Sequence, residues 1–152
     1  MGGRGATLAL RSYRSVAVKK LGPPKEHIAT IPKALKSKLE KRVSLISDEV
    51  EMFESQMTHI QKRHKKDYEF IYKNMNQTIR TPDLVLTDTK DKNILLFIKE
   101  IRSESGVNVV AIGINKYKGD DSVGLRVVSG RKINANELRR MKALKRYKNI
   151  LE

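Results

Sequence analysis

The change of residue pattern at Thr81-Pro82 constrains the fold of this chain more than any other feature. Between residues 68 and 79, apolar side chains recur at the three- and four-residue steps of a helix. Proline cannot continue a helix, so this helix is expected to stop there. Beyond Pro82 the pattern becomes extended, and strands are expected at 84–86 and 93–101, joined as a hairpin.

Two further β-rich segments follow this hairpin, at 107–115 and 125–129, with a polar loop that contains Asp120-Asp121 between them. Asn134, with Glu137 three residues later, resembles a capping box and predicts a C-terminal helix. The order of elements therefore predicts an α+β fold. Helices come first, an antiparallel sheet of about four strands follows, and a helix closes the domain.

The segment before this region carries a helical stripe that ends in a histidine. We expect a short strand at 43–46 and then a helix over 47–66. The stripe consists of Val50, Phe53, Met57, Ile60 and His64. On a helix His59 would lie about 140° away from His64, toward solvent.

A histidine at the rim of a buried face can be oriented by packing and still reach a substrate. This position suits His64 to proton transfer near neutral pH. A core histidine that only satisfies a backbone carbonyl is the other interpretation of the same pattern. Both interpretations stay open at this point.

The charge of the chain points to a polyanionic partner. Its 152 residues carry a formal net charge of +15, and such a basic protein is expected to bind RNA, DNA or an acidic protein. Residues 1–42 alone hold eleven Lys or Arg against two acidic residues. We interpret 1–42 as a basic N-terminal extension that adds affinity without catalytic groups, and 43–152 as the functional domain.

Composition and motifs exclude several classes of protein. With no cysteine, the chain has no disulfide, thiolate nucleophile or zinc-thiolate site. No apolar run reaches transmembrane length, so we expect a cytoplasmic protein without a membrane partner. Neither a Walker motif nor a dinucleotide-binding fingerprint is present, and carboxylates and histidines do not cluster in a metal-binding pattern. We therefore expect no cofactor and no catalytic metal.

Polar side chains on the predicted strands could complete a phosphate site. Lys99 interrupts the apolar alternation of its strand, and Ser129 follows the last one. We expect both on one face of the sheet with Arg126 or Arg131, although Arg126 and Ser129 fall on opposite faces of an ideal strand. Each residue alone also fits a solvated charge at a strand edge or a serine in a turn.

Five short segments, in this order, resemble the phage-associated branch of the barnase/EndoU/colicin/RelE-like (BECR) nucleases. They are His59–Lys65, Thr81–Val85, Phe97–Lys99, Val109–Ala111 and Val127–Ile133. The resemblance spans residues 43–151 and implies a curved antiparallel sheet and metal-independent cleavage of RNA. By position, His64 and His59 match the histidine motif of the family, Lys99 its basic strand residue, and Ser129 its Ser/Thr after the last strand.

These observations lead to one hypothesis and one alternative. The hypothesis is a toxin-like endoribonuclease that cleaves RNA by 2′-hydroxyl attack, with histidine acid-base catalysis. Its expected RNA contacts are Arg63, Lys65, Arg126, Arg131 and Lys132. The alternative is a non-catalytic nucleic-acid-binding or phage structural protein with the same basic surface. A tRNA target and an immunity or antitoxin protein as a second partner are open questions.

Overall fold

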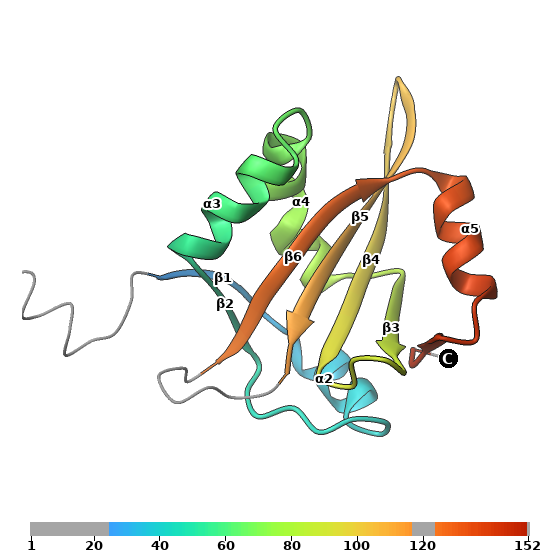
Figure 1. Ribbon diagram of the computed structural model, residues 1–152. Coiled ribbons are helices and arrows are strands. Elements are labelled where there is room, and N and C mark those ends of the chain that lie inside the picture. The colour runs from blue at the N-terminus through green and yellow to red at the C-terminus, as the bar shows by residue number, and fades with distance from the viewer. Residues whose placement is uncertain (1–24, 117–123, 152) are drawn as a thin grey trace, which may run out of the picture.

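The computed structural model describes residues 25–116 and 124–151 (Figure 1). These residues form one mixed sheet in the order β1-β2-β6-β5-β4-β3-β7. The strands are β1 (Lys25–Thr30), β2 (Glu49–Phe53), β3 (Leu84–Asp88), β4 (Ile94–Ser103), β5 (Gly106–Asn115), β6 (Leu125–Ile133) and β7 (Tyr147–Asn149). The helices are α2 (Lys33–Leu39), α3 (Glu54–Arg63), α4 (Tyr68–Arg80) and α5 (Ala135–Ala143).

The middle of the sheet is the predicted meander. Strands β3, β4, β5 and β6 pair antiparallel in sequence order, and β6 continues four residues past its predicted end at Ser129. α4 ends before Pro82, as the sequence predicts. α5 begins at the predicted cap, where the side chain of Asn134 accepts a hydrogen bond from the backbone N–H of Glu137. The α+β class is confirmed, but the sheet is larger than the four strands expected.

Within the predicted helix over 47–66, residues 49–53 form the strand β2 instead, and the helix α3 covers 54–63. Val50 and Met52 are fully buried on one face of β2, while Glu51 between them points to the other face. Pairing with β1 on one side and β6 on the other holds this segment extended. The three-residue step from Val50 to Phe53 fitted a helix, but strand pairing decided the outcome. The expected strand at 43–46 does not form.

Residues 25–42, which the sequence placed in the basic extension, belong to the folded domain. β1 pairs antiparallel with β2, and α2 buries Leu39 completely. The hydroxyl of Tyr72 on α4 donates a hydrogen bond to Glu26, which raises the pKa of Tyr72 to about 12. The local sequence of β1 gave no signal because its partners lie elsewhere in the chain. The rest of the expected extension, residues 1–24, and the Asp120-Asp121 loop lie outside the described residues.

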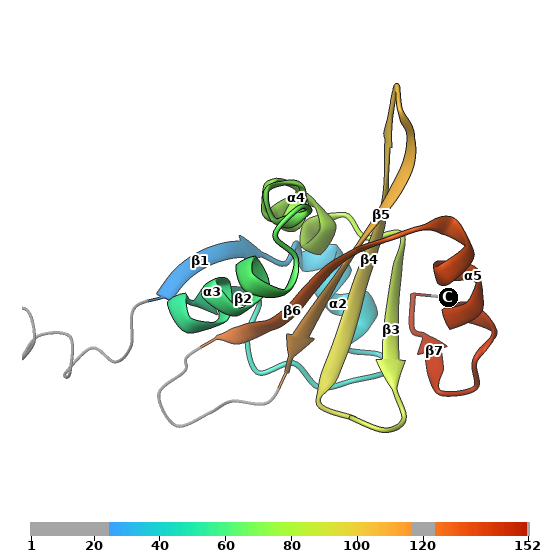
Figure 2. The same ribbon diagram turned by 45° about the horizontal axis from the view of Figure 1, so that its top comes forward.

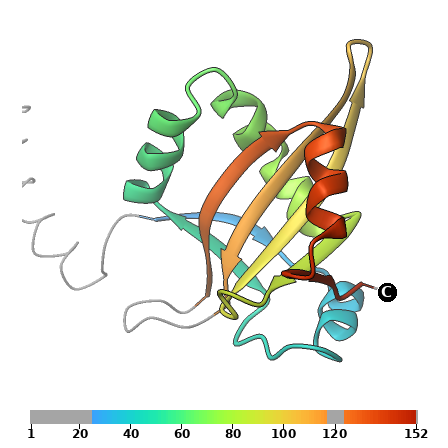
Figure 3. The ribbon, with the colours of Figure 1, turned by 45° about the vertical axis from the view of Figure 1, so that its right-hand side comes forward.

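The two faces of the sheet are covered by different helices (Figures 2 and 3). α3 and α4 pack on one face over the main core, which includes Ile60, Ile71 and Phe97. α5 packs on the other face, where Leu138 and Met141 cover Ile98. No helix in the described part of the chain is long and apolar enough to cross a membrane.

The edge strand β7, absent from the sequence prediction, is fastened by an ion pair. The Arg146 guanidinium donates hydrogen bonds from Nε to Oδ1 of Asp88 (2.9 Å) and from Nη2 to Oδ2 (2.7 Å). The side chain of Asp88 is 8% exposed. Hydrogen bonds from Arg146 hold the pKa of Asp88 below its ordinary value. This pair ties the segment after α5 to the end of β3.

We therefore predict that Asp88→Asn destabilises the protein at neutral pH and much less in acid. The lowered pKa means that the Asp88 carboxylate stabilises the fold fully above its unfolded pKa of about 3.9. This contribution disappears as the pH falls through the lower folded-state pKa. Loss of hydrogen bonds to a charged acceptor costs about 1–3 kcal/mol. Urea denaturation at pH 7 and at pH 3 measures the difference.

Glu104→Gln, in the exposed β4–β5 turn, is the control for loss of a negative charge. The difference in free energy of unfolding between Asp88→Asn and the wild type should be smaller at pH 3 than at pH 7. An equal difference at both pH values would contradict the ionic explanation.

Candidate active site between α3 and β6

The open edge of β6 defines the site. Among the described residues, β2 pairs with β6 in parallel through Val50 with Leu125 and Glu51 with Arg126. The chain then leaves β2 and forms α3, which runs alongside the remainder of β6 (Figure 1). The side-chain amide of Gln56 on α3 donates a hydrogen bond to the carbonyl oxygen of Val128 at 2.6 Å. α3 therefore takes the place beside β6 that a longer β2 would occupy.

A pocket of about 270 Å³ lies between α3 and β6. Its lining residues are His59, Ile60, Arg63, His64, Val128, Ser129, Gly130 and Arg131. We call it the α3–β6 pocket. Five of the residues that the sequence nominated for catalysis or RNA binding meet here, although two elements about 70 positions apart supply them.

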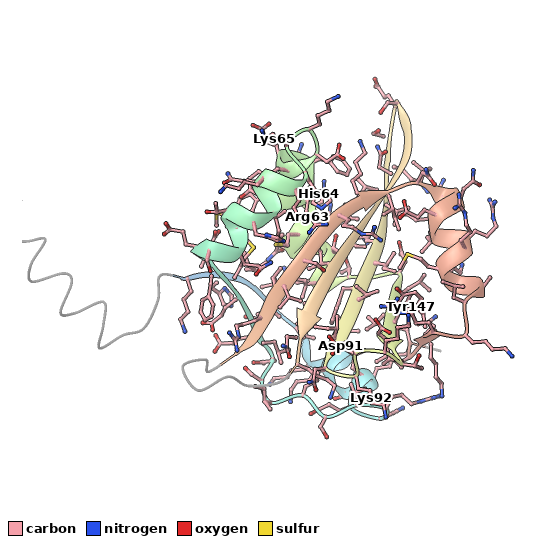
Figure 4. The ribbon with its side chains drawn as sticks, viewed as in Figure 1. Arg63, His64, Lys65, Asp91, Lys92 and Tyr147 are labelled. Carbon is pink, nitrogen blue, oxygen red and sulfur yellow. The ribbon has the colours of Figure 1, made fainter. Side chains whose placement is uncertain are left out.

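His64 owes its position to the end of α3. The helix ends at Arg63, and His64 is its C-cap residue with non-helical backbone angles (φ −131°, ψ 52°). The backbone N–H of His64 donates to the carbonyl oxygen of Ile60, which is buried at 1% exposure. The half-buried side chain lines the pocket and lies with Arg63 beside β6 in Figure 4.

His59 is exposed, as its spacing predicted, but it lines the same pocket as His64. The two histidines would face different ways only on an uninterrupted helix. Because the chain leaves helical geometry at His64, its side chain is not held at the angle that continued helix would give. Arg63, four residues after His59, lies on the same side of α3 as His59.

Gly130 lets the helices approach β6 closely. A Cβ atom at this position would lie 3.0 Å from Cγ2 of Ile71 and 3.6 Å from Cδ1 of Ile60. A side chain here would press on Ile71 of α4 and fill the contact distance to Ile60 of α3. The sequence prediction ended the last strand at residue 129, whereas the structure places Gly130 inside β6. A glycine within a strand pattern is a known signal of close approach, and it could have been read as such.

An irregularity in β6 changes the predicted orientation of its polar residues. Ser129 pairs with Gly113 and Val127 pairs with Ile114, so Val128 is an extra residue on β6. This bulge resets the alternation and puts Arg126 and Ser129 on the same face, where an ideal strand would separate them. The hydroxyl of Ser129 occupies the space that a side chain at Gly113 would need.

Lys99 does not line the α3–β6 pocket. The register pairs Lys99 with Val110 and Val110 with Lys132, so these three share the face covered by α4. Ser129 is three residues before Lys132 on β6, which turns it to the opposite face. The predicted shared face of Lys99 and Ser129 is therefore not observed. The Lys99 ammonium donates instead to the carbonyl oxygen of Thr81 at 2.7 Å, at the C-terminus of α4.

The other predicted RNA contacts surround the pocket or lie farther along β6. Arg131 pairs with Glu137 at 3.3 Å, and Lys132 pairs with Asp67 at 3.5 Å. Lys65 is exposed in the turn after α3. Arg126 lies near the start of β6, with its guanidinium 5.2 Å from the ring centre of Phe53. Within the described ranges, no three His, Asp or Glu side chains are grouped so that they could hold a metal ion.

Comparison with known families identifies the family of this chain. The sequence model of the family described as phage-Barnase-EndoU-ColicinE5/D-RelE like nuclease3 matches residues 26–140. The chain belongs to this nuclease family. No curated protein and no solved structure matches the chain. The match confirms the resemblance drawn from the sequence motifs, and it covers every residue that lines the α3–β6 pocket.

The nuclease-family match also begins inside β1 rather than near residue 43. It includes β1 and β2, the strands that the sequence patterns did not predict, and also α2, where the sequence suggests a short helix over 33–42. This agrees with the structure, in which β1 and α2 contribute to the main core.

We predict that Gln56→Ala loosens α3 from β6 and lowers the free energy of unfolding by about 1 kcal/mol, the usual value of a hydrogen bond to the backbone. Chemical denaturation measures the change. Gln61→Ala, at an exposed position on the same helix, controls for helix propensity. Equal stabilities of the two variants would show that the Gln56 to Val128 contact does not hold α3 in place.

Proposed function

We propose that this nuclease is a metal-independent endoribonuclease and that the α3–β6 pocket is its active site. The observation that carries the proposal is that two histidines and two arginines line one pocket. Acid-base cleavage of RNA needs two groups that exchange protons and cations near the phosphate. The net charge of +15 supports a polyanionic substrate.

The reaction would be transesterification at a phosphodiester. A base removes the proton of the 2′-hydroxyl, and the 2′-oxygen forms a bond to the adjacent phosphorus. The bond from phosphorus to the 5′-oxygen breaks as an acid protonates that oxygen. The products are a 2′,3′-cyclic phosphate and a 5′-hydroxyl end, and no outside reactant is consumed.

His64 and His59 are the two groups that would exchange these protons, because both side chains line the pocket. His64 is the better-fixed of the two, since it is half-buried beside Ile60 while His59 is exposed. Which histidine is the base and which the acid is left to the pH profiles of the variants. Ser129 lines the pocket, but its hydroxyl lies over Gly113 of the neighbouring strand, so we assign it no proton transfer.

Arg63 and Arg131 would neutralise the charge that builds on the phosphate. The C-terminus of α3 points its negative dipole end toward the pocket, which by itself disfavours an anion. Cations at the C-terminus of α3 would therefore offset this unfavourable dipole and stabilise a bound phosphate. Lys65 and Lys132 near the pocket, and Arg126 nearer the start of β6, would contact flanking phosphates of a longer strand.

We predict that His64→Ala lowers the rate of RNA cleavage by about 10²- to 10⁴-fold, the usual effect of removing a general acid or base. Total RNA is incubated with excess chelator, and the fragments are separated on a denaturing gel. Chelator should leave the wild-type rate unchanged. The fold of the variant is checked by its urea midpoint.

His27→Ala is the matched control, because His27 lies on β1 outside the pocket. Its cleavage rate should equal that of the wild type. Wild-type binding to RNA without cleavage would favour the non-catalytic alternative, and equal rates for His64→Ala and wild type would refute the site.

We predict that Arg63→Ala reduces kcat by about 10²-fold, because a donor aimed at developing charge acts mainly in the transition state. Steady-state kinetics on a short RNA separates kcat from KM. Arg80→Ala, an exposed arginine at the end of α4, removes the same charge away from the pocket. A rise in KM with unchanged kcat would make Arg63 a binding residue only.

A further inference from the structure

A second pocket, of about 430 Å³, lies at the opposite edge of the sheet. Its walls include three cations, two leucines and an aromatic ring: Arg42, Lys142, Lys148, Leu84, Leu86 and Tyr147. We call it the β3–β7 pocket. Strands β5, β4 and β3 separate β7 from β6, so these two strands are about 19 Å apart across the sheet at ~4.8 Å per strand.

Family membership does not assign this second pocket. The family match ends at residue 140, and Lys142, Tyr147 and Lys148 all follow it. Figure 4 shows Tyr147 across the sheet from Arg63 and His64. A ligand of the β3–β7 pocket would therefore contact residues that have no role in the proposed active site.

The lining chemistry matches a nucleotide. Leu84 and Leu86 on β3 supply an apolar floor, and Tyr147 supplies a ring on which a base could stack. The guanidinium of Arg146 lies 5.1 Å from the centre of that ring and helps to hold it. Lys142 and Lys148 are exposed and form no salt bridge within the described ranges. An apolar cleft with cations at its rim suits a base with an attached phosphate.

α5 connects the two pockets with positive charge. It begins next to Arg131 of the α3–β6 pocket, whose guanidinium pairs with Glu137 in the first turn. Residues 139–148 then contain six Lys or Arg and no acidic residue. A polyanion bound in the α3–β6 pocket and extending along α5 would therefore lie against cations as far as the β3–β7 pocket.

We propose that the β3–β7 pocket is a second RNA-binding site, which holds a nucleotide several positions away from the bond that is cleaved. The base would lie against the leucines and Tyr147, and the phosphate would contact Lys142, Lys148 and Arg42. The choice of RNA rests on the proposed function, but binding at this pocket does not require cleavage.

The first test measures binding of a fluorescent 2′-O-methyl RNA, which lacks the 2′-hydroxyl nucleophile, by anisotropy at several salt concentrations. The double variant Lys142→Glu/Lys148→Glu should bind more weakly than the wild type. The slope of log Kobs against log salt should become less negative by about 1.4, because two phosphate contacts on a single strand are lost.

The control is Lys33→Glu/Lys73→Glu, which changes two exposed lysines on α2 and α4 and alters the net charge equally. It should keep the wild-type slope. Identical affinities and slopes for the two double variants would overturn the proposal, because the effect would then be one of net charge alone.

The second test asks whether the site recognises a base. Tyr147→Leu should weaken binding of the 2′-O-methyl RNA about tenfold, whereas Tyr147→Phe, which keeps the ring, should bind like the wild type. Binding of inorganic polyphosphate should not change in either variant. Equal losses for RNA and polyphosphate would overturn the nucleotide assignment, as would a full loss in Tyr147→Phe.

Cleavage of a dinucleotide distinguishes this inference from the proposed function. A dinucleotide cannot reach both pockets, so Lys142→Glu/Lys148→Glu should cleave it at the wild-type rate while KM for a long RNA rises. If the wild type cleaves no RNA at all, the proposed function fails. The anisotropy result still decides whether the β3–β7 pocket binds RNA.

Discussion

The short pairing between β2 and β6 is the constraint on which the candidate active site depends. In the described part of the chain the pairing reaches Glu51 and Arg126, and beyond them the edge of β6 would be open to solvent or to another strand. α3 covers this edge and is attached by the Gln56 amide. A longer β2 would complete the sheet and leave no room for a pocket. The same short contact thus protects the edge and creates the concave site.

The distribution of charge is the second organising feature of the molecule. A net charge of +15 in 152 residues opposes compaction through self-repulsion. Some cations are neutralised by local partners, as Arg146 is by Asp88 and Lys132 is by Asp67. Others gather where α3 ends and along α5. Such clusters are costly for a fold alone, and their cost is offset when a polyanion binds.

Elements with a strong local pattern could be predicted from the sequence. The β3–β4 hairpin, β5, α4 and the cap of α5 follow from alternation, helical spacing, Pro82 and Asn134. β1, β2 and β7 could not, because each acquires its hydrogen bonds from a strand that other elements separate from it in the sequence. Val50 illustrates the difficulty, since its spacing to Phe53 fits a helix while its pairing makes it a strand.

The sequence by itself determined that His64 follows a buried position, that β6 carries cations, and that the chain is a strongly basic α+β protein. Tertiary structure decided which of these residues meet. The bulge at Val128 turned Ser129 to the face of Arg126, and register placed Lys99 on the other face at the end of α4. The helix end at Arg63 brought His59 and His64 to one pocket. The local sequence pattern indicates which face of a helix or strand a residue lies on. Only the strand register and the points at which helices and strands end determine which of these faces meet.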